Sequence, residues 1–150
     1  MTKNMTEDAV RDLARDILGL VNNEKARAGV GQLTTFNQLG FTGIVDKPDG
    51  WYLPNNKVDV ALVLETTATR ISLGQAQVDE LLKNINIMQT KYEKVIGILY
   101  NGEDVRVFKG NEEIKTPDTL QNLEYYLSLY TVDKIDKERI YQLTARINNC

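Results

Sequence analysis

Histidine is absent from this chain of 150 residues, and cysteine occurs once, at Cys150. Without histidine, the usual zinc sites and the Ser-His and Cys-His nucleophilic centres are excluded. A single cysteine cannot form a disulfide within the chain. The chemistry that remains belongs to carboxylates, lysine, tyrosine and hydroxyl groups, so we expect any metal ion to be held by oxygen atoms.

Long apolar runs are also missing. No stretch approaches the roughly 18 apolar residues of a membrane-spanning helix, and the opening MTKNMTEDAV lacks the apolar segment of a signal peptide. We therefore expect a cytoplasmic protein without a membrane partner, folded as one domain over residues 1–150. Its net charge of −3 gives no overall attraction to phosphate, so affinity for DNA would gain from tethering to a larger protein.

Apolar periodicity predicts helices and strands in a mixed order. Helices are expected at residues 6–21 and 75–89, from residue 117, and after Asp136. Strands are expected at residues 41–45, 51–53, 58–64, 95–100 and 105–108, the last two joined by a hairpin turn at Asn101-Gly102 that Glu103 and Asp104 would lengthen. Residues 22–35 are expected to form a loop or a loosely structured helix end. This order predicts an α/β (α+β) fold in which helices flank a mixed central sheet.

Two acidic residues, Asp49 and Glu65, stand at similar distances from the turn predicted near residues 55–57. Antiparallel pairing of the flanking strands would bring both carboxylates to one end of the sheet, close enough to share Mg²⁺. Because side chains alternate along a strand, Thr67 is expected on the same face as Glu65. Each acid alone also has a structural interpretation: Asp49 belongs to an Asp-Gly turn, and Glu65 to a solvated strand end.

The stretch PDGWYLPNNKVDVALVLETT resembles the core signature of the PD-(D/E)XK nuclease superfamily. In that signature a Pro-Asp pair, a spacer and an apolar segment precede an acid-any-Lys triplet. Two later stretches, GQAQVDELLKNINIM and KVIGILYNGEDVRVFKG, are similar to the glutamine-bearing helix and the strand-turn-strand of restriction-type nuclease domains. The resemblance covers residues 40–110.

This resemblance implies a restriction-endonuclease-like fold and the hydrolysis of DNA phosphodiester bonds with Mg²⁺, or with Mn²⁺ in its place. Carried over by motif, Asp49 and Glu65 are metal ligands through their carboxylates, and Thr66 is a ligand through its backbone carbonyl. The implied context is the N-terminal nuclease part of a restriction-modification protein, whose methyltransferase or helicase domains are the partners besides DNA.

Thr67 stands where the family pattern has lysine. A hydroxyl can orient a water molecule but adds no positive charge, and losing one such electrostatic contact typically costs about 10²- to 10³-fold in rate. Lys47, two residues before Asp49, and Lys83, in the following helix, are the candidate substitutes. Three hypotheses stay open: an active endonuclease, a catalytically degenerate module for nucleic-acid binding or assembly, and a protein-interaction domain.

Polar and aromatic neighbours of the motif have two interpretations each. The second predicted helix begins with Gln75 and Gln77. The family resemblance implies that they contact the site or the DNA backbone, whereas on an ordinary polar helix face they would be solvated. Trp51 and Tyr52 would either stack on a base or, as we favour, pack in the core.

Overall fold

The computed structural model describes residues 4–18, 20 and 25–114, so the helices predicted from residue 117 and after Asp136 lie outside the described part. The elements follow the chain as α1 (Glu7–Leu18), β1 (Ala26–Ala28), β2 (Gly50–Tyr52), β3 (Val60–Thr66), α2 (Gln75–Met88), β4 (Lys94–Tyr100), β5 (Val105–Lys109) and β6 (Glu112–Ile114). None of the described helices has the length and apolarity needed to cross a bilayer.

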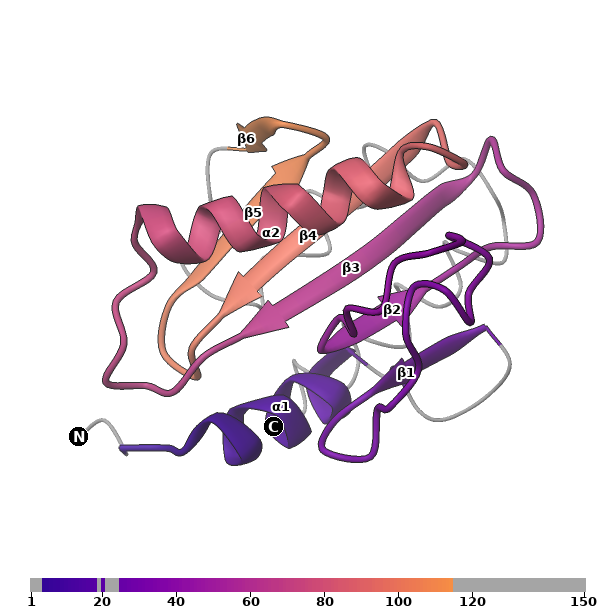
Figure 1. Ribbon diagram of the computed structural model, residues 1–150. Helices are drawn as coiled ribbons and strands as arrows, with labels where there is room; N and C mark the ends of the chain where they lie inside the picture. The colour runs from indigo at the N-terminus through magenta and orange to yellow at the C-terminus, as the bar shows by residue number, and fades with distance from the viewer. Residues whose placement is uncertain (1–3, 19, 21–24, 115–150) are drawn as a thin grey trace.

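The strands form one mixed sheet in which chain order and spatial order are the same (Figure 1). Every neighbouring pair is antiparallel except β3 and β4, which run parallel and are joined by α2. A parallel pair needs such a crossover, because both carboxyl ends must reach the same edge of the sheet. The predicted α+β fold, a mixed sheet flanked by helices, is confirmed.

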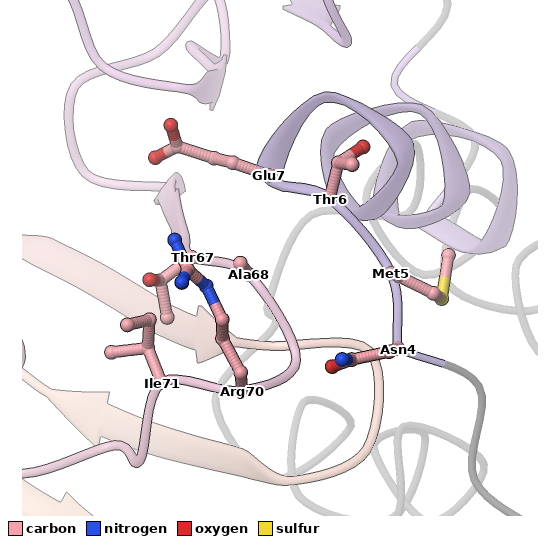
Figure 2. Close-up of a pocket in the computed structure, with 8 residues that line it drawn as sticks. All are labelled: Asn4, Met5, Thr6, Glu7, Thr67, Ala68, Arg70 and Ile71. Carbon is pink, nitrogen blue, oxygen red and sulfur yellow. The ribbon is translucent and has the colours of Figure 1, made fainter.

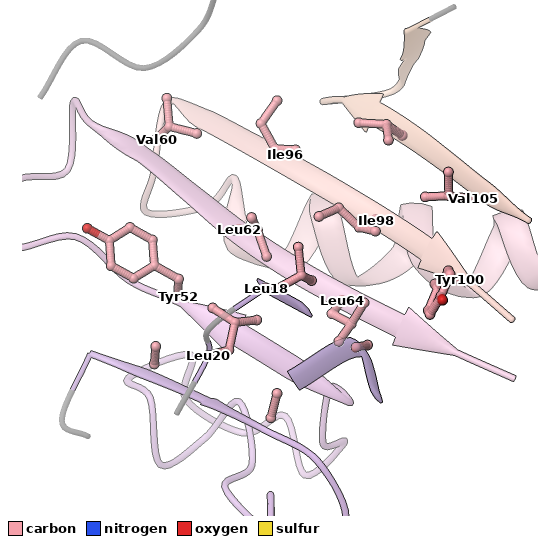
Figure 3. Close-up of a cluster of buried hydrophobic side chains, with 14 of the residues drawn as sticks. Leu18, Leu20, Tyr52, Val60, Leu62, Leu64, Ile96, Ile98, Tyr100 and Val105 are labelled. Atoms are coloured by element: carbon pink, nitrogen blue, oxygen red, sulfur yellow. The ribbon is translucent and has the colours of Figure 1, made fainter. Parts of the chain in front are cut away.

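The two helices cover opposite faces of the sheet, and strand alternation explains why. On β3, Leu62 and Leu64 join a buried cluster with residues of α1 (Figure 3), whereas Ala61 and Val63 join a second cluster with residues of α2. Successive side chains of a strand point to opposite faces. The nearly continuous apolar run of VDVALVL therefore reflects a strand that is buried on both sides, as predicted.

Local chemistry sets where each helix begins and how closely it packs. The hydroxyl of Thr6 accepts a hydrogen bond from the Ala9 N–H (3.2 Å), which makes Thr6 the expected N-cap of α1. On the other face, a methyl group at Gly97 of β4 would overlap Ile85 of α2 and lie 3.1 Å from Leu81. The absence of a side chain at Gly97 thus lets α2 approach the sheet.

The structure departs from the predicted elements at three places, whereas the turn between β4 and β5 agrees with the prediction. Residues 41–45 form turns rather than a strand, because Gly40 and Gly43 take positive φ values of 98° and 87° that fold the segment back. The loop predicted at residues 22–35 contains the short edge strand β1, and β6 was not predicted. The turn between β4 and β5 has the lengthened form, with the Asn101 side chain accepting hydrogen bonds from the Glu103 and Asp104 N–H groups.

Candidate active site

The register of β2 and β3 brings the two predicted acids together. Gly50 lies opposite Leu64, so Asp49 and Glu65 adjoin one another just beyond the paired residues. The backbone N–H of Asp49 donates a hydrogen bond to Glu65 Oε2 (3.1 Å) across 16 positions of sequence. The acids thus meet at the carboxyl end of β3, beside the carboxyl end of parallel β4, which is the edge where ligands bind in open α/β sheets.

The Asp49 carboxylate is held by hydrogen-bond donors. Its Oδ2 accepts hydrogen bonds from the Thr66 N–H (2.8 Å) and the Thr66 hydroxyl (3.0 Å), and its Oδ1 lies 3.2 Å from Nη2 of Arg11 on α1. Burial raises the pKa of Asp49, while Thr66 and the charge of Arg11 act in the opposite direction. Asp49 is therefore a fixed group that ties the start of β2 to the end of β3 and to α1.

Glu65 has more negative charge around it than Asp49 has. The pKa of Glu65 is raised to about 9, mainly by burial and then by the nearby charges of Asp49 and of Glu80 on α2. The Asp49 N–H and the charge of Lys83 oppose this shift. Without a cation, Glu65 thus holds a proton at neutral pH, so two adjoining carboxyl groups share a region that lacks enough positive charge to ionise both.

Of the two candidate lysines, Lys83 is the one whose charge acts on Glu65. Its Nζ lies 2.9 Å from Glu80 Oε1 and 3.1 Å from Asp46 Oδ2, on the α2 side of the sheet. Lys47 is exposed and precedes β2 in a segment that is not a strand. Because Lys47 lies outside a strand, side-chain alternation does not place it on the face of Asp49, and its role at the site stays a prediction.

Thr67 and the two glutamines have identifiable structural partners. Thr67 follows the last residue of β3, and its N–H donates to the Tyr100 carbonyl (3.1 Å). The Gln75 side chain donates to Asp79 Oδ1 (2.7 Å), and the Gln77 side chain accepts from the Gly74 N–H (3.0 Å) at the start of α2. These contacts give both glutamines a role in the helix itself, and their contact with nucleic acid stays a prediction.

Gln32, which sequence inspection missed, fixes the chain just before Asp49. It is 6% exposed, donates to the Pro48 carbonyl (2.9 Å) and accepts from the Trp51 indole N–H (3.2 Å). Trp51 is itself 3% exposed, so it packs in the core as favoured above. Arg11 and Glu80 were missed as well, because no sequence pattern shows which residues of the two helices approach the end of β3.

A cavity of about 410 Å³ lies between the start of α1 and the chain that leaves β3, with Thr67 in its wall (Figure 2). Two hydrogen bonds hold the two segments together: the Thr69 N–H donates to the Met5 carbonyl (3.1 Å), and the Met5 N–H donates to the Thr69 hydroxyl (3.2 Å). The cavity is lined by Asn4, Met5, Thr6, Glu7, Thr67, Ala68, Arg70 and Ile71.

The donors available for a metal ion at the acids are all oxygen. Within residues 4–114 as described, no three histidine, cysteine, aspartate or glutamate side chains form a group that could hold a metal. A metal site here would combine the carboxylates of Asp49 and Glu65 with a backbone carbonyl such as that of Thr66. Oxygen donors and an excess of negative charge suit a hard divalent cation such as Mg²⁺.

Comparisons with known proteins give no family for this chain. No family model matches the sequence, and neither a curated protein nor a solved structure matches it. Function therefore has to be argued from the geometry of the site and from the sequence resemblance described above.

Proposed function

We propose that this chain is a Mg²⁺-dependent endonuclease domain that hydrolyses DNA phosphodiester bonds. The observation that carries the proposal is the meeting of Asp49 and Glu65 at the carboxyl end of β3, joined by the hydrogen bond from the Asp49 N–H to the Glu65 carboxyl group (3.1 Å). The charge of Asp49 helps to raise the pKa of the buried Glu65, and such an excess of negative charge favours a cation. The order of these acids in the chain is that of the PD-(D/E)XK signature.

Asp49, Glu65 and the Thr66 carbonyl would hold the ion. When bound, Mg²⁺ polarises a phosphoryl oxygen and lowers the pKa of a water molecule. The chain's own contribution is positioning: Thr66 fixes the Asp49 carboxylate through two hydrogen bonds, and Gln32 fixes the Pro48 carbonyl next to it. Deprotonated Glu65 would complete the anionic site.

Positive charge at the reacting phosphate would come from the helices rather than from residue 67. Thr67 carries no charge, whereas Arg11 of α1 contacts Asp49 and the charge of Lys83 of α2 reaches Glu65. A cation next to a developing phosphorane stabilises it electrostatically. We therefore assign to Lys83 the role that the family pattern gives to lysine, with Arg11 as a second source of charge.

One observation favours a second candidate function, a degenerate module of the same type that binds nucleic acid without cleaving it. Both oxygens of the Asp49 carboxylate already have partners, in Thr66 and Arg11. A metal ion would have to share Oδ1 with the guanidinium or displace it. If Arg11 keeps the ion out, the acids serve the structure alone.

Nicking of supercoiled plasmid and a metal-dependent thermal shift separate these candidates. With Mg²⁺ or Mn²⁺, the wild type should nick plasmid and melt at a higher temperature, because a ligand of the native state raises stability. Glu65→Gln should abolish both effects while keeping the shape of the site. Glu112→Gln, at an exposed position of β6, is the matched control. A wild type that neither nicks plasmid nor changes its melting temperature with either ion contradicts the nuclease and supports the degenerate module in which Arg11 keeps the ion out. A thermal shift without nicking would show an ion bound at a site that does not cleave.

A further inference from the structure

The cavity between α1 and residues 67–71 is linked to the acids through the segments that form its two walls. Thr67 in one wall follows directly after Thr66, which holds Asp49, and Glu7 in the other wall lies one helical turn before Arg11, which also contacts Asp49. A polymer whose phosphate lies at the acids would therefore pass by this opening. The volume of about 410 Å³ is within the usual range of ligand pockets.

The lining of the cavity combines groups of opposite polarity. Glu7 and Asn4 offer oxygen acceptors, Arg70 offers a guanidinium, and Met5, Ala68 and Ile71 add apolar surface. Figure 2 shows Glu7 and Arg70 arising from opposite walls. A nucleotide has the matching parts, because its phosphate is anionic, its base edge carries N–H donors, and its ring faces are apolar.

Arg70 is the cation of this cavity that is free to meet a phosphate. Glu7 already lies 3.7 Å from the Arg11 guanidinium, which is further engaged by Asp8 and Asp49. In contrast, no acidic side chain within the described residues forms an ion pair with Arg70, and its side chain is exposed at the opening. Arginine is well suited to phosphate because its planar fork can donate two parallel hydrogen bonds.

We propose that this cavity holds a nucleotide of the DNA strand next to the scissile phosphate, with Arg70 bound to a backbone phosphate. The inference rests on the proposed nuclease function, since it assumes that DNA lies across Asp49 and Glu65. It adds a substrate subsite and a phosphate-binding residue that lie outside the metal ligands. Thr67 then serves as part of the subsite wall instead of as a replacement for lysine.

Fluorescence anisotropy with a labelled DNA duplex tests this subsite, with Ca²⁺ in place of Mg²⁺ so that cleavage does not intervene. Arg70→Ala should weaken binding about tenfold, the size expected for a charge-assisted hydrogen bond, and reduce the slope of log affinity against log salt by about 0.9. Arg70→Lys should recover part of the affinity, because lysine restores the charge but cannot donate two parallel hydrogen bonds to one phosphate.

Lys57→Ala is the matched control, because it removes one exposed positive charge from the turn before β3, at the end of that strand remote from the acids. Equal affinity and salt slope for Arg70→Ala and Lys57→Ala would overturn the subsite even if plasmid nicking is observed. Loss of affinity specific to Arg70 without any nicking would support the cavity while contradicting the nuclease. A wild type that binds no DNA would contradict both.

Discussion

Asp49 and Glu65 lie next to each other in the fold yet occupy unlike environments. Asp49 accepts two hydrogen bonds from Thr66 and pairs with Arg11, whereas Glu65 accepts one from the Asp49 N–H and has Glu80 nearby. Burial raises the pKa of both, and the donors at Asp49 oppose this effect without cancelling it, while the pKa of Glu65 is raised to about 9. Asp49 is therefore a structural anchor as well as a candidate ligand, and Glu65 is the group that a cation would change most.

This difference divides the site between the two faces of the sheet. Asp49 is tied to α1 through Arg11, and Glu65 is influenced from α2 by Glu80 and Lys83. Each helix thus brings a cation toward one acid, and Glu80 of α2 adds a negative charge that raises the pKa of both. A divalent ion between the acids would supply the charge that the α2 side lacks.

Removing each carboxyl group in turn should have the largest and most unequal effects. Without divalent ions at neutral pH, Asp49→Ala should lower the free energy of unfolding by about 3 kcal/mol, because the Thr66 N–H and Arg11 lose their shared partner. Glu65→Ala should cost much less, since it removes a neutral group whose one strong contact is with the Asp49 N–H. Urea unfolding measures both, and equal losses would contradict the proposed division of roles.

The pH dependence of stability should come mainly from Glu65. In the absence of metal, native Glu65 keeps its proton up to about pH 9, whereas in the unfolded chain it releases the proton near the ordinary glutamate pKa of 4.5. The native state thus binds more protons across this window, so stability falls as pH rises, by at most about 1.4 kcal/mol per pH unit. Urea unfolding from pH 5 to pH 9 checks this, and Glu65→Gln should remove most of the slope, since only the smaller contribution of Asp49 at lower pH remains.

Metal affinity should change with pH in the opposite sense to stability. Mg²⁺ has to displace the proton of Glu65, so its affinity should rise with pH below the pKa of about 9, by at most tenfold per pH unit. Calorimetric titration with Mg²⁺ or Mn²⁺ at pH 6.5 and pH 8 measures this. An affinity that is the same at both values would show that the ion does not bind through Glu65.

The sequence predicts the meeting of the two acids but not the asymmetry between them. Their similar distances from the turn at residues 55–57 are sufficient to predict that they meet. In an antiparallel pair, residues at equal distances from the turn lie opposite each other. The position of Lys47 could not be derived in the same way, since Pro48 interrupts the strand pattern. Arg11, Gln32 and Glu80 reach the site through tertiary packing, which depends on how each helix and loop lies on the sheet.

Fold prediction succeeded and failed for similar reasons. The apolar run of β3 and the helical period of α2 are strong sequence signals, because burial requires apolar residues at many positions of each element. Strands β1 and β6, of three residues each, are too short to show a period. At residues 41–45 the apolar content suggested a strand, but the positive φ values of Gly40 and Gly43 override it.

The smallest expected effects concern the two charged residues of α2 that influence Glu65. Glu80→Gln should lower the pKa of Glu65, and with it the midpoint of the pH-dependent loss of stability, whereas Lys83→Met should raise both. Each shift should stay below about one pH unit, because solvent screens charges on side chains that are half exposed. Carbon-13 NMR titration of the Glu65 carboxyl group resolves changes of this size.

The double variant sharpens the test of this last pair. Because Glu80 and Lys83 carry opposite charges and contact each other at 2.9 Å, removing both should return the pKa of Glu65 toward the wild-type value. Glu112→Gln removes a carboxylate on β6 and should leave the titration unchanged. Shifts of the same sign in both single variants would mean that α2 acts on Glu65 by changing its burial rather than by its charges, and Lys83 would then lose its proposed role at the phosphate.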